Sequence, residues 1–287
     1  MTPSISDLRY QEVIAANQKV HTALAGIYNA SEPQFRPENV AHVESRLRPI
    51  FEETKAKRLL DLGCGTGFII DIAKKYVPEI DGVDVTEAML RQVDCSGEAS
   101  IRLHLGDAGV FPAEADAYDV VTAYSFLHHL YDIGPTLTTA SQALRPGGKF
   151  YVDLEPNYYF WSAMKSLPPE GSYHSIVERE RAAVLERGSQ IENQYRIDRE
   201  VFDTAEYGKN ETGGFAEERL AQALYSAGFS GVSFSYYWFL GQAGIVNDSG
   251  FGREQAVMAA QTCAEALTKA LPLTRHLFKY VGFVAIR

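Results

Sequence analysis

Apolar positions near the N-terminus follow helical spacing. Residues 5–20 and 38–53 carry apolar side chains three and four positions apart, which predicts two amphipathic helices. Pro37 is well placed to open the second helix. Between them, residues 28–37 hold two prolines, an asparagine and a serine. We expect a loop there that could fold over a neighbouring site.

Downstream of residue 58, short apolar runs alternate with segments of helical periodicity. The apolar runs predict strands at 58–62, 80–84, 101–105, 119–123 and 149–154. The segments between them predict helices at 68–76, 87–93 and 135–144. A repeated strand and helix order predicts a parallel sheet with helices on both faces.

This alternation stops at residues 155–214, which contain many aromatic residues, two consecutive prolines, a charged helical pattern at 175–187 and a glycine pair. We interpret this stretch as an inserted cap. The alternation then resumes with helices at 216–227 and 253–270 and strands at 232–239 and 278–286. The expected fold class is therefore α/β, a doubly wound, seven-stranded and mostly parallel sheet with an inserted cap and N-terminal helices.

Composition and charge narrow the kinds of partner. No run of 18 apolar residues offers a membrane span, and a net charge of −10 argues against a nucleic-acid partner, which needs Lys and Arg to neutralise phosphates. The N-terminus has neither a basic leader nor a continuous apolar segment, which predicts a cytoplasmic protein. The three cysteines lie far apart, without the spacing of metal ligands, and we expect no bound metal. The oligomeric state stays open.

The most informative segment is residues 58–70, where an apolar run enters a glycine-rich turn that opens a helix. Gly63, Gly65 and Gly67 allow a sharp bend and let the backbone approach a ligand closely. Backbone amides at a helix N-terminus then face that ligand. In an open α/β sheet the ligand crevice lies beyond the carboxyl ends of the strands, which is where this turn falls. Glycine turns also join strands to helices without binding anything, so the turn alone leaves both interpretations open.

Asp84 ends the next predicted strand, seventeen residues after Gly67. An acidic side chain at that position can accept hydrogen bonds from ribose hydroxyls. Dinucleotide dehydrogenases use the same arrangement, but their G-x-G-x-x-G fingerprint differs from this turn, where Phe68 occupies the position of the third glycine. The glycine turn and Asp84 together favour a ligand that contains a nucleoside but is not a nicotinamide dinucleotide.

Residues 60–67, Leu-Asp-Leu-Gly-Cys-Gly-Thr-Gly, together with Asp84 resemble motif I and the acidic second-strand end of class I S-adenosylmethionine-dependent methyltransferases. Segments 106–108, 118–130 and 144–150 resemble later blocks of that family in the same order. The resemblance covers about residues 58–155. It implies the Rossmann-like methyltransferase fold, S-adenosyl-L-methionine as cofactor and S-adenosyl-L-homocysteine as product.

The resemblance also implies a set of cofactor-binding residues. By position, Asp61, Gly63 and Gly65 would line the methionine moiety, Asp84 the ribose and Asp107 the adenine amino group. Met89, which could equally be a core residue, would contact an adenine face. The full implied set is Asp61, Gly63, Cys64, Gly65, Gly67, Asp84, Val85, Met89, Asp107, Ala108, Tyr124 and Ser125. The chain then divides into an N-terminal helical lid (1–57), a cofactor-binding core (58–154), the cap and substrate region (155–214) and the rest of the core (215–287).

Catalytic candidates follow the fourth and fifth strands. If the acceptor is a hydroxyl or an acidic carbon, a positioned base would help, and His128 or His129 is the first choice. A buried structural role for these histidines stays open. Glu155 ends the fifth strand and would suit a cationic or amine substrate, unless the strand simply ends at Pro156.

Acceptor contacts are expected from the lid and the cap, because variable loops on a rigid scaffold carry specificity. The candidates are Tyr28, Phe35, Arg36, Tyr158 and Trp161. Motifs of nucleic-acid and protein arginine methyltransferases are missing after the fourth strand, which favours a small-molecule acceptor. The sequence therefore predicts methyl transfer to an O, N or C atom of a small molecule by in-line displacement. A non-catalytic S-adenosylmethionine-binding module and an NAD-dependent oxidoreductase are the alternatives.

Overall fold

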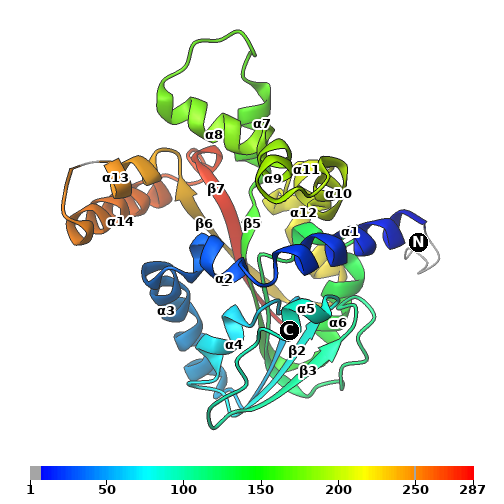
Figure 1. The fold of residues 1–287 in the computed structure, drawn as a ribbon. Helices are drawn as coiled ribbons and strands as arrows, with labels where there is room; N and C mark the ends of the chain where they lie inside the picture. Colours follow the sequence, from blue (N-terminus) through cyan, green and yellow to red (C-terminus); the bar gives the residue numbers. More distant parts are fainter. Residues whose placement is uncertain (1–7, 249) are drawn as a thin grey trace.

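A seven-stranded sheet forms the centre of the computed structural model, which describes residues 8–248 and 250–287 (Figure 1). The strands lie in the order β3-β2-β1-β4-β5-β7-β6. Strands β1 to β5 pair in parallel, and β7 runs antiparallel to both β5 and β6. The strands are β1 Arg58–Leu62, β2 Glu79–Asp84, β3 Ser100–Leu105, β4 Tyr118–Tyr124, β5 Leu144–Pro156, β6 Gly231–Phe239 and β7 Phe278–Ile286. The predicted doubly wound, mostly parallel sheet is confirmed.

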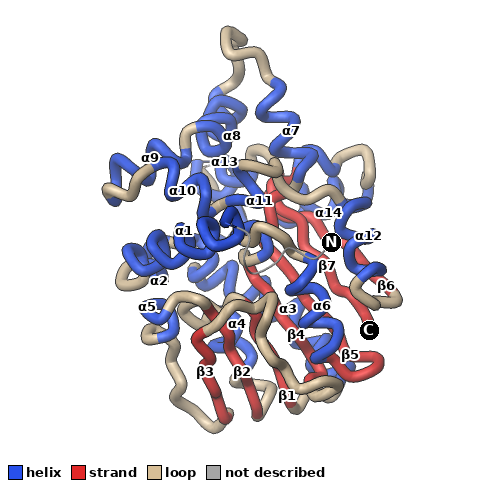
Figure 2. The backbone as a smooth tube through the Cα atoms, turned by 90° about the vertical axis from the view of Figure 1, so that its right-hand side faces the viewer, coloured by secondary structure: helices blue, strands red, loops and turns tan. Residues whose placement is uncertain are grey.

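Helices cover both faces of the sheet (Figure 2), and residues along β1 alternate between the two faces. Leu60 and Leu62 pack in the cluster that includes helices α6 (Gly134–Ala143) and α12 (Glu217–Ser226), whereas Leu59 packs with α3 (Pro37–Thr54) and α4 (Phe68–Ala73). All three leucines are buried, and burial of a leucine contributes about 1.5 to 3 kcal/mol. This core, packed on both faces, holds the carboxyl ends of the parallel strands β1 to β5 together at one edge of the sheet.

The N-terminal helices cross that edge. Helix α1 spans Leu8–Leu24; the expected start at residue 5 lies outside the described residues. The expected loop at 28–37 is wrong in part: α2 (Tyr28–Ser31) and the 3-10 helix η1 (Pro33–Phe35) occupy most of it. Pro33 opens η1, because a proline at the first helical position loses no hydrogen bond there. Pro37 opens α3 as expected.

Five helices follow β5 and project beyond the sheet in Figure 1. They are α7 Tyr158–Ser166, α8 Ser175–Leu185, α9 Arg187–Tyr195, α10 Arg199–Ala205 and α11 Tyr207–Asn210. Apolar residues of α1, α9 and α10 share one buried cluster, which includes Val20, Leu24, Ile191 and Phe202. This part of the cap and the N-terminal helix therefore form one packed unit over the carboxyl ends of the parallel strands.

The remaining helices are short connections or lie along the sheet's far edge. They are α5 Glu87–Leu90, η2 Leu127–His129, α13 Gln242–Asp248, α14 Arg253–Lys269 and η3 Arg275–Leu277. Across residues 8–248 and 250–287, none of the helices combines the length and apolar character needed to cross a membrane.

Candidate active site

A cavity lies at the carboxyl ends of β1, β2 and β4, beneath α1 and α2. The space between its walls, open solvent at its mouth included, amounts to about 1090 Å³. Its walls include most of the predicted cofactor residues: Asp61, Gly63, Cys64, Gly65, Asp84, Val85, Met89, Asp107, Ala108, Tyr124 and Ser125. Gly67 does not line the cavity and instead caps the N-terminus of α4 with φ of 89°. The structure thus gathers residues up to 64 positions apart in one place.

The glycine turn and Asp84 hold each other in position. One Asp84 carboxylate oxygen accepts a hydrogen bond from the Gly65 amide at 2.9 Å, and the other accepts from the Thr86 amide at 2.8 Å. Gly63 has φ of 68°, and the ring of Phe126 packs where a side chain would begin. A Cβ at Gly63 would therefore collide with Phe126, which explains the glycine there.

Asp61 carries an oxygen without a partner. Its side chain is buried, and Oδ1 accepts a hydrogen bond from the Thr122 hydroxyl at 2.7 Å. Oδ2 has no hydrogen-bond partner within the part of the chain that the structure describes. Burial raises the pKa of Asp61 to about 7, against the opposing effect of the Thr122 bond. A buried carboxylate oxygen in a cavity wall is suited to a ligand that brings a donor, such as an ammonium group.

The other end of the cavity is formed by Asp107 and its neighbours. Asp107 Oδ1 accepts from the Gly109 amide at 2.8 Å, and the Tyr10 hydroxyl of α1 donates to Oδ2. Met89 and Ala108 are buried and line the same region. Met89 is thus both a buried residue and a cavity residue, so the two interpretations of the sequence are compatible.

Sequence reasoning missed the contribution of α1. Tyr10, Val13, Ile14, Asn17 and His21 line the cavity, at spacings of three and four along one helix face. The signal was present, because two polar residues, Asn17 and His21, lie on the face that also buries Val13. Polar residues on the apolar face of a predicted helix indicate a site beneath it.

Glu155 and His128, predicted as catalytic candidates, form hydrogen bonds with each other and with the backbone of η2. The Glu155 carboxylate is fully buried and accepts four hydrogen bonds: from the backbone amides of Phe126, Leu127 and His128, and from His128 Nδ1 at 2.8 Å. Neither residue lines the cavity. Their geometry supports positioning of the turn η2 after β4.

His129 is the histidine that reaches the cavity. Its Nδ1 lies 2.8 Å from the carbonyl oxygen of Ala205, which can only accept, so Nδ1 carries the hydrogen and Nε2 carries the lone pair. Burial, and next the neighbouring His128, hold the pKa of His129 well below its usual value. The ring is therefore neutral at pH 7, and its Nε2 lone pair is a weak base.

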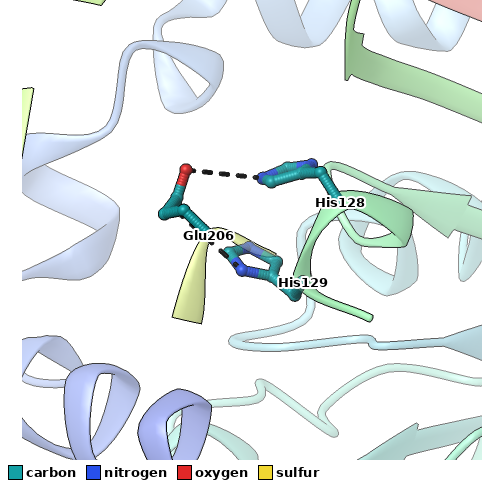
Figure 3. A group of neighbouring side chains, drawn as sticks. All are labelled: His128, His129 and Glu206. Carbon is teal, nitrogen blue, oxygen red and sulfur yellow. Dashed lines mark ion pairs between the residues drawn. The ribbon is translucent and has the colours of Figure 1, made fainter. Parts of the chain in front are cut away.

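Figure 3 shows His128, His129 and Glu206 turned toward one another. Glu206 Oε2 lies 3.9 Å from His128 Nε2, and Glu206 Oε1 lies 3.9 Å from His129 Nδ1. Two imidazoles and a carboxylate are ligands that Zn²⁺ accepts. However, the Lys209 ammonium lies 2.5 Å from Glu206 Oε2 and supplies a positive charge, and His129 Nδ1 is already bonded to Ala205. We interpret the group as a polar clamp that joins the cap to η2, and we retain the expectation of no metal.

The residues that were predicted to contact the methyl acceptor separate into two groups. Tyr28 and Phe35 line the cavity and begin a row of aromatic rings that continues through Phe68 to Tyr124, with ring centroids 4.7 to 6.2 Å apart. Arg36, Tyr158 and Trp161 do not line it. Trp161 is fully buried against Phe160 and Tyr280, because the cap's aromatic residues pack on the sheet edge.

Known proteins resemble the central part of this chain. Residues 60–152 match the family model described as "Methyltransferase domain". Over 113 residues the chain is 30% identical to a ubiquinone biosynthesis O-methyltransferase of Hydrogenovibrio crunogenus, an alignment that covers 38% of this chain and 47% of the relative. The chain thus spans about half the length of the curated relatives it matches.

Solved structures show the same fold. An S-adenosylmethionine-dependent methyltransferase from Mesorhizobium loti aligns with a TM-score of 0.52 and 18% identity, covering 90% of this chain and 99% of that one. The [4+2]-cyclase SpnF aligns with a TM-score of 0.51 and 16% identity, covering 94% of each chain. The Rossmann-like methyltransferase fold and the resemblance to the class I family are confirmed.

Proposed function

We propose that this chain, whose residues 60–152 match a methyltransferase-domain model, transfers a methyl group from S-adenosylmethionine to a small-molecule acceptor. The observation that carries the proposal is the pairing of Asp61 and Asp84 in one cavity wall. Asp61 Oδ2 is buried without a partner, and Asp84 is fastened to the glycine turn. These are the acceptors that an ammonium group and a pair of ribose hydroxyls require.

The residues present fit that cofactor. Asp61 would hold its ammonium group, Asp84 the ribose, and Asp107 with Met89 and Ala108 the adenine. The bound cofactor supplies an electrophilic methyl group on a positively charged sulfur. The aromatic row from Tyr28 to Tyr124 stabilises positive charge nearby, because the face of an aromatic ring is electron-rich.

The protein's own contribution is alignment, exclusion of water and, for a hydroxyl acceptor, proton removal. Helices α1 and α2 cover the cavity, which keeps the reacting groups together and limits water. His129 would accept the hydroxyl proton at Nε2 as the methyl group is transferred, because its lowered pKa leaves it too weak a base to ionise a hydroxyl beforehand. Glu155 and His128 hold η2, and therefore His129, at the end of β4.

Charge in the cavity bears on the acceptor. Asp61, Asp84, Asp107 and Asp132 line it, and among the residues that the structure describes no Lys or Arg does. Asp61, Asp84 and Asp107 are assigned to the cofactor, which leaves Asp132 and no cationic side chain to meet the acceptor, so we propose a neutral or cationic one. The name O-methyltransferase of the Hydrogenovibrio relative supports a hydroxyl as the acceptor group.

The test is transfer of a labelled methyl group from S-adenosylmethionine to matched phenols, amines and benzoates, with release of S-adenosylhomocysteine as the second readout. We expect labelled product and stoichiometric S-adenosylhomocysteine with uncharged or cationic acceptors, and little with benzoates. Binding of S-adenosylhomocysteine without transfer to any acceptor would favour the non-catalytic module. That alternative needs a direct test, since the structure of a [4+2]-cyclase shares the fold.

Asp61 predicts how cofactor binding depends on pH. Its raised pKa of about 7 means that the carboxylate form grows as the pH rises through that value. Because an ammonium group binds the ionised carboxylate, affinity for S-adenosylhomocysteine should increase up to about tenfold between about pH 6 and pH 8. Calorimetric titrations across this range measure it.

Asp61→Asn is the control for that prediction, because it keeps the shape and cannot ionise. The variant should bind more weakly at about pH 8 and show a flat profile. In the absence of ligand, stability depends on pH in the opposite direction. The folded state binds the proton on the Asp61 carboxyl group more tightly than the unfolded state does, so the free energy of unfolding of the wild-type chain falls as the pH rises toward about 7. A wild-type affinity that is constant with pH would contradict the assigned role.

No nucleic-acid partner and a cytoplasmic location stay predictions from the sequence.

A further inference from the structure

Asn17, on the buried face of α1, has a side-chain amide whose orientation is fixed. Its Nδ2 donates to the carbonyl oxygens of Val13 at 2.9 Å and His129 at 3.0 Å. Rotation of the amide by 180° would place Oδ1 against those two oxygens, which cannot donate. Both amide hydrogens are therefore used, and Oδ1 is the remaining hydrogen-bonding atom.

That oxygen has no partner. Asn17 is 6% exposed, and Oδ1 is buried without a hydrogen bond within residues 8–248 and 250–287. A buried polar atom left unpaired costs about 1 to 3 kcal/mol, so native structures usually supply a partner. Asp61 Oδ2 is in the same condition, and both residues line the same cavity. Two unpaired acceptors in one cavity indicate a ligand that brings two or more donor hydrogens.

The neighbours of Asn17 on α1 show which part of a ligand it would meet. Gln18 Nε2 donates to the carbonyl oxygen of Val85, the residue after Asp84, at 3.0 Å. Burial raises the pKa of Asp84, and His21 lies close enough to oppose part of that rise. Asn17 itself reaches the His129 carbonyl on the β4 side. It therefore lies between the acidic ribose position and the turn after β4.

We propose that Asn17 binds the methyl donor, with Oδ1 accepting a hydrogen from a ribose hydroxyl or from the ammonium group. This inference rests on the proposed function. Its consequence is that the bound cofactor fastens α1 over the cavity, since Asn17 joins the ligand to Val13 on its own helix and to His129 on the core.

The experiment compares Asn17→Leu with Asn17→Asp. Both variants lose the two amide donors, but only Asp keeps an oxygen that can accept. The Asp carboxylate can also attract an ammonium group by its charge, so the comparison is repeated with a ligand that has no ammonium group. Affinity is measured by calorimetry for S-adenosylhomocysteine and for 5′-methylthioadenosine, which has the ribose and lacks the amino-acid group. We expect Asn17→Leu to bind S-adenosylhomocysteine about fivefold or more weakly than Asn17→Asp. An equal loss with 5′-methylthioadenosine assigns the hydroxyl, and no loss assigns the ammonium group.

Equal affinities of the Leu and Asp variants would overturn the inference, whether or not both differ from the wild type. A second measurement needs no variant: hydrogen exchange at the amides of residues 8–24 should slow when S-adenosylhomocysteine binds the wild-type chain. Unchanged exchange would contradict the fastening of α1. Failure of the proposed function is distinguishable: if the cavity is not a cofactor site, the wild type does not bind S-adenosylhomocysteine at all, and if only methyl transfer fails, the wild type binds it but forms no labelled product.

Discussion

Glu155→Ala is expected to lower the free energy of unfolding by about 3 kcal/mol or more. The substitution leaves three backbone amides and His128 Nδ1 without their acceptor in a buried position, and each unpaired donor is costly. For a chain of this size the midpoint of thermal unfolding should fall by roughly 6 to 12 °C. Thermal unfolding followed by circular dichroism measures it.

Two controls separate this role from catalysis. Glu155→Gln keeps one carbonyl oxygen to accept from the amides of η2 and should lose less stability than the alanine variant. Glu217→Gln changes a carboxylate at the start of α12, away from η2, and should have a small effect. If Glu155→Ala unfolded at the wild-type temperature, the structural role of the carboxylate would be refuted. A catalytic role for Glu155 would then again be the better interpretation.

Asp84→Ala is expected to weaken binding of S-adenosylhomocysteine tenfold or more. Loss of hydrogen bonds to a charged group removes about 1.5 to 3 kcal/mol. The structure adds a second cause, because the same carboxylate accepts from the Gly65 and Thr86 amides and so shapes the glycine turn. Calorimetric titration measures the affinity.

Asp84→Asn separates the two causes. The asparagine keeps one oxygen for a backbone amide of the turn but has lost the charge that receives the hydroxyls. We expect an affinity between those of the wild type and the alanine variant. Full affinity in Asp84→Ala would remove this residue from the cofactor site.

The sheet could be predicted from the sequence because its signals are local. Strand β1 has the predicted bounds 58–62, and Phe68 begins α4 as expected. Five apolar runs with helical segments in three of the four intervals between them leave few topologies besides a parallel sheet. The antiparallel direction of β7, which follows α14, carries no local signal, and the sequence predicted only that the sheet is mostly parallel.

The roles of individual side chains depended on contacts between distant segments. Glu155 meets the amides of residues 126–128, which no spacing rule connects to it. His129 could be distinguished from His128 only once the cap was in place, because the Ala205 carbonyl fixes its ring. Arg36 and Phe35 are adjacent in sequence, yet only Phe35 faces the cavity, since η1 ends between them. The sequence predicted a loop for this segment, and a predicted loop does not indicate which side chains face the cavity.

Titration calorimetry of the purified chain with S-adenosylhomocysteine and, separately, with NAD decides whether the cavity binds S-adenosylmethionine. We expect micromolar binding of S-adenosylhomocysteine and none of NAD. Binding of NAD alone would restore the oxidoreductase alternative, and binding of neither would show that the cavity is not a site for this cofactor.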